Sequence, residues 1–331
     1  MKKTTVVISV VSIIIGVLIG KLLPSSNNNS KLAVKQDNSL KEVRESGYKF
    51  ISPLLECETG NDYYKLNGLN SLQAEVSDLV DAWKNTGQIT NGAVYFRELN
   101  NGPWFGVNEH NTFSPASLLK LPVMMAYYKK AENDPQLLTK KVKYTGADVL
   151  LGQDIAPTNS IVKGKEYTIE DLVERMVIYS DNAALTVLED NIEPGLIDKV
   201  TIDLGVETAK DTTPVDFMSV KGYAGLFRIL YNASYLEKND SEKTLEILSK
   251  VQFDGGLVAG VPKGITVSHK FGERQLEANL VQLHDCGIIY NPHNPYLLCV
   301  MTSGKNFSNL EQFIAKVSSI TFNGIEARVR N

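Results

Sequence analysis

The stretch Phe113-Ser-Pro-Ala-Ser117-Leu-Leu-Lys120-Leu-Pro-Val-Met-Met-Ala-Tyr-Tyr128 decides the fold of this chain. Beyond Ser117 it is apolar on almost every side, which predicts a helix buried deep in a domain. Pro115 favours a helix start, so Ser117 is expected in the first turn, where backbone N–H groups lack intrahelical acceptors. Lys120 follows one turn later on the same face. Desolvation would lower the pKa of this lysine and suit it to act as a base.

The ordinary alternative is a surface serine followed by a lysine whose amine reaches solvent at the end of a core helix. Ser-x-x-Lys pairs also arise by chance, and two others occur here, Ser46 with Lys49 and Ser160 with Lys163. The pair that begins at Ser117 therefore needs support from other parts of the chain.

A second polar string, Ser180-Asp181-Asn182, lies between two predicted helices. Thr168 and Asp171 resemble a capping box at the start of the first helix, and the second helix begins at Ala183. The apolar stripe of the first helix is Ile169, Leu172, Val173, Met176 and Val177. A tripeptide held between packed helices can project into a cleft, but all three residue types are also good N-caps. Both interpretations stay open.

A third string, Lys270-Phe271-Gly272, ends the β-branched stretch 265–272, which predicts a strand. Two more strands are expected at Leu283–Tyr290 and Tyr296–Thr302, joined in a hairpin by Asn291-Pro-His-Asn-Pro295. The glycine would let the backbone of a ligand approach closely. Taken alone, the lysine is more simply a solvated residue on a strand.

Helices near both ends of the chain complete the expected fold. Residues 70–86 predict an amphipathic helix with Leu72, Val76, Leu79, Val80 and Trp83 inward. The pair Ser308 and Glu311 predicts the start of a last helix. Its stripe is Leu310, Phe313, Ile314 and Val317. The expected fold class is therefore α/β of the α+β type, an antiparallel sheet flanked by N- and C-terminal helices, with a helical insert at about 113–255.

Residues 1–23 are interpreted as a membrane anchor or signal segment. The uncharged run 4–20 follows two lysines and is near the lower length limit for spanning a bilayer. The positive charge predicts an internal N-terminus and a chain body outside the cytoplasm. A single-pass anchor in the cell membrane is expected, with secretion after signal cleavage as the alternative. Residues 24–45 predict a flexible linker, 46–331 the folded domain, and the apolar residues of 47–66 are expected to pack on it.

Composition excludes other classes of protein. A net charge of −4 and a pI near 5.7 offer no basic face for nucleic acid. The histidines lack ligand spacing and the cysteines form no C-x-x-C, so neither a metal nor another cofactor is expected. Cys286 and Cys299 fall on neighbouring predicted strands. Their oxidation to a disulfide and their burial as free thiols both remain open.

In this order the three strings resemble the signature of the penicillin-recognising serine hydrolases, most closely the class A β-lactamase branch. Residues 91–108 resemble the first hairpin of that fold, and Asp211-Thr-Thr-Pro214 resembles the segment that closes its Ω-loop. The resemblance covers residues 68–331. It implies a β-lactamase/transpeptidase-like fold with an all-α subdomain and an active site between the two halves.

The resemblance implies an acyl-enzyme mechanism. Ser117 Oγ would attack a carbonyl carbon and become acylated, and Lys120 would take its proton, although the identity of the base is disputed for this group. Ser180 would pass a proton to the departing nitrogen. The oxyanion would lie between the backbone N–H groups of Ser117 and Glu273.

Substrate binding is implied for a second set of residues. Asn182 would hydrogen-bond the side-chain amide of the substrate, and Lys270 would attract the substrate carboxylate beside Gly272. Phe271 departs from the family pattern because it replaces a hydroxyl residue that donates to that carboxylate. Arg274 could compensate with a bidentate contact.

A larger departure concerns the Ω-loop, where active class A enzymes carry a Glu-x-x-x-Asn whose glutamate activates the deacylating water. Only 28 residues lie between Asn182 and Asp211. Glu193 is followed by Ile197 in place of the asparagine, and Pro194 instead predicts the first residue of a helix that runs to about residue 204. Glu207, Asp211 and Asp216 remain candidates for activating this water, although no motif supports any of them.

The sequence therefore predicts a monomeric, membrane-tethered serine β-lactamase-like hydrolase, acylated at Ser117 by β-lactams and slow to deacylate. One alternative is a D,D-carboxypeptidase or transpeptidase-like enzyme acting on peptidoglycan stem peptides. Another is a module that binds β-lactams or wall fragments without turnover. The missing Ω-loop glutamate favours both alternatives.

Overall fold

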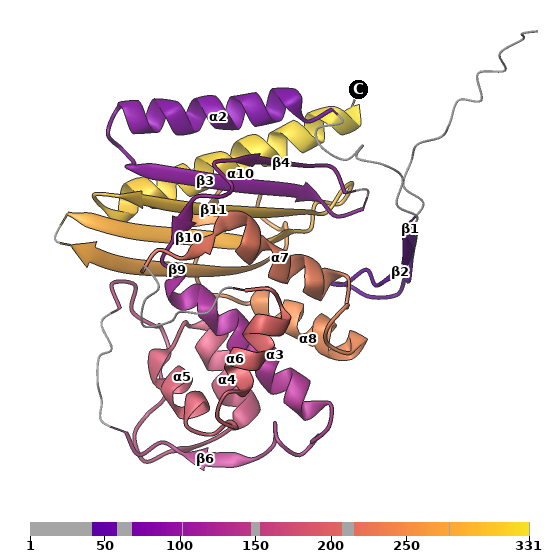
Figure 1. Cartoon of the computed structure of the whole chain (residues 1–331), viewed down its shortest axis with the longest axis vertical. Helices are drawn as coiled ribbons and strands as arrows, with labels where there is room; N and C mark the ends of the chain where they lie inside the picture. The colour runs from indigo at the N-terminus through magenta and orange to yellow at the C-terminus, as the bar shows by residue number, and fades with distance from the viewer. Residues whose placement is uncertain are drawn as a thin grey trace, which may run out of the picture. The chain divides into compact units, whose positions relative to one another are not determined.

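The computed structural model describes residues 42–57, 68–100, 102–146, 153–206, 215–277 and 279–330, all in one compact unit that begins at Leu40 (Figure 1). The predicted anchor at 1–23 and the segment Asp211–Pro214 lie outside the described residues. Within the described part of the chain, no helix combines the length and apolar character that crossing a bilayer requires.

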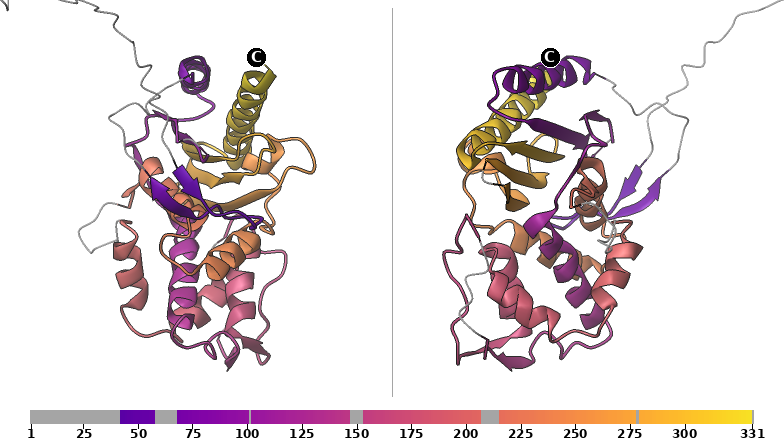
Figure 2. Two further views of the ribbon diagram at one scale, coloured as in Figure 1. Left: turned by 90° about the vertical axis from the view of Figure 1, so that its right-hand side faces the viewer. Right: turned by 60° about the vertical axis from the view of Figure 1, so that its left-hand side comes forward.

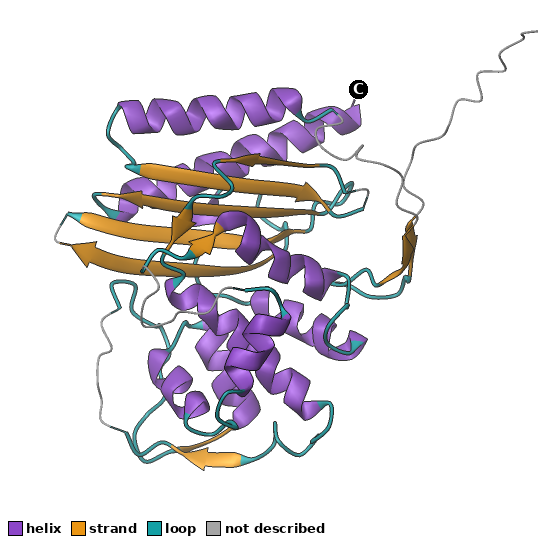
Figure 3. Cartoon of the chain, viewed as in Figure 1, coloured by secondary structure: helices purple, strands orange, loops and turns teal. Residues whose placement is uncertain are grey.

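A five-stranded antiparallel sheet forms the centre of the unit (Figure 3). Its strand order is β4-β3-β11-β10-β9. The strands are β3 (Asn91–Glu98), β4 (Trp104–Val107), β9 (Val267–Glu277), β10 (Leu280–Ile289) and β11 (Tyr296–Gly304). The strand β3 pairs with β11, so strands about 200 residues apart in the chain lie side by side. The strand β9 is an edge strand, so one side of it faces no other strand.

Two helices, α2 (Asn70–Asn85) and α10 (Phe307–Arg330), lie together over one face of the sheet (Figures 1 and 2). Leu72, Val76 and Val80 of α2 are buried, and the predicted stripe of α10 has no exposed surface. The start of α10 differs from the prediction. Asn306 Oδ1 accepts the N–H of Asn309 at 2.9 Å, so an asparagine before the helix caps it, in place of a box formed by Ser308 and Glu311.

The other face of the sheet meets the helical part of the molecule, in which α7 (Val220–Tyr231) contacts β3, β10 and β11. The remaining elements there include a 3₁₀ turn, five helices and two small two-stranded pairs. They are η1 (Ala116–Leu119), α3 (Lys120–Ala131), α4 (Ile169–Ile178), α5 (Asn182–Glu189), α6 (Leu196–Asp203), α8 (Lys238–Leu248), β5 (Thr112–Phe113) with β8 (Met218–Ser219), and β6 (Lys141–Lys143) with β7 (Glu166–Thr168). A further short helix, α9 (Gly256–Ala259), packs against α10.

The helix that the apolar stretch predicts is α3, and it is buried on every side. Met124, Met125, Ala126 and Tyr127 have no exposed surface. The start of α6 is different from the prediction. Gly195, with φ +80°, closes a turn in which the Leu196 N–H bonds to the Glu193 carbonyl, so the helix begins after Pro194.

The N-terminal part of the described chain packs on the body. The strands β1 (Glu42–Arg44) and β2 (Leu54–Cys57) pair, so the last residues of the predicted linker form a strand. The Glu242 carboxylate accepts the backbone N–H groups of Lys49, Phe50 and Ile51 at 2.9, 3.0 and 2.9 Å. These charge-assisted bonds and the buried Phe50 and Ile51 side chains fix the segment.

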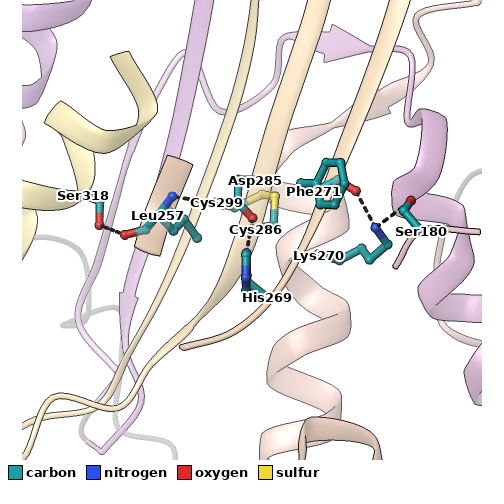
Figure 4. Close-up of polar contacts among 9 residues, drawn as sticks. All are labelled: Ser180, Leu257, His269, Lys270, Phe271, Asp285, Cys286, Cys299 and Ser318. Carbon is teal, nitrogen blue, oxygen red and sulfur yellow. Dashed lines mark hydrogen bonds and ion pairs between the residues drawn. A yellow bond between two sulfur atoms is a disulfide. The ribbon is translucent and has the colours of Figure 1, made fainter. Parts of the chain in front are cut away.

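A disulfide joins Cys286 of β10 to Cys299 of β11, at directly opposite positions of the sheet (Figure 4). The structure thereby decides between the two thiol states that the sequence left open. The two cysteines are 13 residues apart in the chain, and a disulfide that closes a loop of this length adds about 3 kcal/mol to the unfolding free energy.

We expect reductant to lower the unfolding free energy of the wild-type protein by about 3 kcal/mol in urea titrations. The double variant Cys286→Ala, Cys299→Ala should start near the reduced value and be insensitive to reductant. Equal urea midpoints for the oxidised and reduced wild-type protein would contradict the prediction.

Candidate active site

A cavity of about 440 Å³ lies where η1, α3, α5 and the edge strand β9 meet. Its walls contain five of the eight predicted site residues, Ser117, Lys120, Asn182, Glu273 and Arg274. The volume lies in the range of small-molecule sites. The three other predicted residues, Ser180, Lys270 and Gly272, are buried next to it.

Ser117 lies in the turn η1 at the wall of this cavity and is partly exposed. The residue before it, Ala116, has φ +47°, a left-handed conformation that costs a non-glycine residue free energy. Pro115 stands at the N-cap of η1, as predicted. Among the residues that the structure describes, none hydrogen-bonds the Ser117 hydroxyl, so its oxygen is open to a ligand in the cavity.

Lys120 is almost fully buried, which excludes the interpretation as a surface lysine. Its Nζ donates to the Ser180 carbonyl oxygen and to Asn182 Oδ1, both at 2.6 Å, and lies 3.1 Å from Ser180 Oγ. Burial lowers the pKa of Lys120 to about 7, although the nearby Asp181 and Glu273 carboxylates favour the charged form. About half of the amine is therefore neutral near pH 7.

No described hydrogen bond joins Lys120 Nζ to Ser117 Oγ. The ammonium form has three donors, and the three acceptors on Ser180 and Asn182 satisfy them. In the neutral form two N–H groups can stay on the two 2.6 Å acceptors, and the lone pair becomes available. The amine is then able to accept a proton within the cavity that it shares with Ser117.

Ser180 Oγ lies between two buried amines: it is 3.1 Å from Lys120 Nζ and 3.2 Å from Lys270 Nζ, the contact that Figure 4 draws. Lys270 also donates to the Phe271 carbonyl oxygen at 2.9 Å. Burial, together with the charge of Lys120, holds the pKa of Lys270 well below its usual value, while Asp285 opposes this shift. A hydroxyl between two amines can pass a proton from one to the other. The interpretation of Lys270 as a solvated strand residue is wrong, since it has no exposed surface.

Asp181 caps the start of α5, which is one of the two interpretations that the sequence allowed for Ser180-Asp181-Asn182. Its carboxylate accepts the Ala183 N–H at 2.9 Å, the Ser160 hydroxyl at 2.9 Å and the Ile161 N–H at 2.8 Å. Ser180, which has φ +57°, and Asn182 instead face Lys120. Both interpretations of the tripeptide therefore hold, for different residues.

Gly272 accommodates the protein's own backbone. A Cβ at this position would lie 2.9 Å from the Pro115 carbonyl oxygen and 3.1 Å from the Leu118 nitrogen. The missing Cβ therefore makes room for η1, and the expected approach of a ligand backbone at this residue stays a prediction. The close packing sets the edge of β9, including the backbone of Glu273, beside Ser117.

The side chain of Glu273 is tied to the segment between β6 and β7. Its Oε1 accepts the N–H groups of Asp154 at 3.0 Å and of Ile155 at 3.3 Å. Burial raises the pKa of this carboxyl group. Gln153 also lines the cavity and donates to the Ser180 carbonyl oxygen at 2.9 Å. Sequence reasoning missed Gln153, which stands in no motif.

Phe271 and Arg274 take different positions. The Phe271 ring is buried and stacks on Phe253 with centroids 4.4 Å apart, so this side chain gives no donor to a substrate carboxylate. Arg274 lines the cavity, and its Nη1 donates to Ser114 Oγ at 3.1 Å. The predicted contact of Arg274 with a substrate carboxylate stays a prediction.

Of the acidic residues that the sequence singled out, the two that the structure describes, Glu193 and Asp216, do not line the cavity. Glu193 forms an ion pair with Lys130 at 3.2 Å, and the Asp216 carboxylate accepts the Gln282 amide N–H₂. Glu207 and Asp211 lie outside the described residues. Glu189 does line the cavity, and partial burial raises its pKa. It was missed, although it lies seven residues after Asn182 on the same face of α5.

The antiparallel sheet, the helical part and a serine beside buried lysines define the class of penicillin-recognising serine hydrolases. The chain belongs to the beta-lactamase enzyme family, whose model matches residues 71–325. A search of curated proteins finds no match.

Solved structures share the fold. A point mutant of PBP-A, solved as an acyl-enzyme complex with penicillin G, superposes with a TM-score of 0.66 at 21% identity, covering 78% of this chain and 97% of that one. A β-lactamase from Chitinophaga pinensis DSM 2588 gives 0.67 at 18% identity, with 77% and 100% covered. The TLA-3 extended-spectrum β-lactamase gives 0.67 at 17% identity, with 78% and 99% covered. At these identities the likeness is one of fold.

Proposed function

We propose that this protein is a serine β-lactamase-like hydrolase that β-lactams acylate at Ser117 and that releases the acyl group slowly. One observation carries the proposal: the Ser180 hydroxyl lies between the buried amines of Lys120 and Lys270, next to the cavity that contains Ser117. A nucleophile, a base with a pKa of about 7 and a proton relay are thus assembled in one place.

In the proposed acylation, Ser117 Oγ forms a bond to the lactam carbonyl carbon while a neutral Lys120 accepts the hydroxyl proton. The carbonyl–nitrogen bond then breaks, and Ser180 delivers its proton to the departing nitrogen and receives from Lys120 the proton that Ser117 gave up. The backbone N–H groups of Ser117 and Glu273 stabilise the oxyanion. Lys270 in its charged form holds the substrate carboxylate, whose negative charge favours that form.

Slow deacylation is proposed from the positions of the carboxylates. Glu189 is the acidic residue on the α5 face of the cavity, and seven residues correspond to roughly 10 Å along the helix from Asn182. No described carboxylate hydrogen-bonds Ser117 or Lys120. We infer that none of the described carboxylates activates the water that attacks the acyl ester.

Intact-mass measurement after mixing with benzylpenicillin tests the proposal. We expect the mass of the chain to increase by the mass of one penicillin. This adduct should persist for many turnover times of an efficient β-lactamase. Rapid return to the free mass would show fast deacylation and refute the slow step. A mass that never changes would support a binding module and refute the enzyme.

A D,D-peptidase is the second candidate, supported by the same lack of a described carboxylate hydrogen-bonded to Ser117 or Lys120 and by the similarity in fold to PBP-A. Release of terminal D-alanine from a synthetic stem peptide, measured together with penicillin hydrolysis, separates the two activities. For either activity we propose an N-terminal membrane tether and a domain outside the cytoplasm. The Cys286–Cys299 disulfide supports that location, because disulfides persist in oxidising compartments.

Gly272→Ala is expected to slow acylation by roughly tenfold or more and to destabilise the fold by about 1–3 kcal/mol. The added methyl group would push β9 away from Pro115 and Leu118 and so displace the two oxyanion donors. Stopped-flow acylation and urea unfolding measure both effects. Gly225→Ala on α7, where a Cβ meets nothing within 4 Å, is the matched control and should acylate normally. Normal acylation by Gly272→Ala would contradict the prediction.

A further inference from the structure

Ser114, three residues before the nucleophile, is held at every polar atom it has. Its N–H donates to Gln282 Oε1 at 2.9 Å, and its carbonyl oxygen accepts from His284 Nε2 at 2.9 Å. Its hydroxyl oxygen accepts from Arg274 Nη1 at 3.1 Å. Ser114, Gln282 and His284 are almost completely buried. We call the side chains of Gln282, His284 and Arg274 the Ser114 clamp.

The sheet register places the clamp on one surface. Gln282 stands opposite Arg274, and His284 stands opposite Gly272, on the paired strands β10 and β9. Alternate residues of a strand share a face, so all four lie on the same side of the sheet. Gly272 leaves the space into which η1 packs, and the three polar side chains around that space hold Ser114.

Second contacts fix how the clamp is oriented. The Thr302 N–H donates to His284 Nδ1 at 3.2 Å, so His284 carries its proton on Nε2 and donates it to Ser114. Gln282 Nε2 donates to the Asp216 carboxylate at 3.0 Å, which turns Gln282 Oε1 towards the Ser114 N–H. Burial lowers the pKa of His284 to about 4, so this donor stays neutral throughout the neutral pH range.

The clamp adjoins the strained turn. Ala116, with φ +47°, lies two residues after Ser114 and directly before Ser117. On the other side of the turn, Tyr223 Oη donates to the Leu118 carbonyl oxygen at 3.0 Å. Such a conformation persists only where the surroundings over-determine it. The backbone is therefore held on both sides of Ala116 by contacts that come from the rest of the fold.

We propose that Gln282, His284 and Arg274 are positioning residues for Ser117. Through Ser114 they hold the left-handed turn that aims the Ser117 hydroxyl and its backbone N–H into the cavity. This inference rests on the proposed function, because it concerns how readily that serine is acylated. It assigns a task to Gln282 and His284, which would touch the reaction only through another residue, and it assigns Arg274 a task beside its predicted contact with the substrate carboxylate.

The test separates binding from reaction. Gln282→Leu removes the acceptor for Ser114, and the acylation rate at saturating benzylpenicillin should fall by about 100-fold while the dissociation constant of the initial complex changes by less than about threefold. Gln282→Glu combined with Asp216→Asn reverses the polarity of that pair and keeps an acceptor for the Ser114 N–H. It should restore the rate to within about fivefold of the wild-type value. Ser268→Ala, which removes a buried hydroxyl of β9 that bonds to Leu245, controls for general loss of stability.

Ser114→Ala supplies a second measurement in case Gln282→Leu fails to fold, since it removes only the contact with Arg274. About tenfold slower acylation is expected. Gln282→Leu and Ser114→Ala reacting within about twofold of the wild-type rate would overturn the proposal. So would a double variant as slow as Gln282→Leu, or an equal loss of rate in Ser268→Ala.

A fluorophosphonate, which phosphonylates activated serines without needing a lactam, keeps the two proposals distinguishable. If the wild-type protein does not react with penicillin but the probe labels Ser117, the proposed substrate is wrong. The effect of the clamp variants is then measured as the rate at which the probe labels Ser117. If neither reagent labels Ser117, both proposals fail, because each requires a positioned nucleophile.

Discussion

Ser117→Ala should give no penicillin adduct, a loss of at least roughly 1,000-fold in the rate of mass gain. The hydroxyl is the group that forms the covalent bond in the proposed reaction, and no neighbouring side chain can replace it. The variant should fold like the wild-type protein, because the Ser117 side chain is partly exposed and makes no hydrogen bond to described residues. Intact-mass spectrometry with peptide mapping of the wild-type adduct provides the measurement.

The other Ser-x-x-Lys pairs supply the matched control. Ser46 is an exposed serine three residues before the exposed Lys49, so Ser46→Ala should form the full adduct. An adduct on Ser117→Ala, or peptide mapping that places the wild-type adduct elsewhere, would remove Ser117 from the mechanism.

Lys120→Ala should slow acylation by about 10²–10⁴-fold, the range for loss of a general base. In the wild-type protein the rate should follow the neutral fraction of Lys120. Because the neutral amine is the form that accepts the proton and its pKa is about 7, the rate should be near its plateau above pH 8. It should be about one-tenth of the plateau at pH 6 and fall about tenfold per further pH unit. Stopped-flow acylation between pH 5.5 and 9 measures this profile.

Lys163→Ala, at the exposed lysine of a third Ser-x-x-Lys pair, is the control and should keep both rate and profile. A flat wild-type profile across this range would show that Lys120 does not supply the base. The same conclusion would follow if Lys120→Ala acylated within about tenfold of the wild-type rate.

Much of the fold could be predicted because periodic apolar patterns report local structure directly. The stripe of the last helix and the all-round apolar character of the stretch after Ser117 both match helices with the expected buried residues, α10 and α3. The strand β9 extends beyond its predicted end to Glu277. Its last residues are largely exposed and polar, and backbone pairing with β10 holds them in the strand. No hydrophobic pattern in the sequence therefore predicts this extension.

The local errors have a common cause. The start of α6 moved past Pro194 because Gly195 adopts a left-handed turn, and Asn306 caps α10 in place of Ser308. In both cases several neighbouring residues are acceptable helix starts. The choice among them depends on where the packed helix must begin, which propensity alone does not report.

Some residues of the candidate site could be predicted from local motifs, and others depend on the tertiary structure. Three short motifs named Ser117, Lys120, Ser180 and Lys270, and the structure brings the stretches that contain them together around one cavity. Residues outside motifs were missed. Glu189 could have been found from its helical spacing after Asn182, whereas Gln153 and the Ser114 clamp depend on contacts between residues far apart in the chain.

By itself the sequence determined the elements, the family resemblance and the chemistry-bearing residues, since each is written in local patterns of polarity and residue type. Only the tertiary structure decided that Lys270 is buried, that Gly272 receives the backbone of η1 and that Cys286 bonds to Cys299. Burial and partner choice arise when distant segments exclude water from one another. The pKa of Lys120 is therefore a property of the assembled fold.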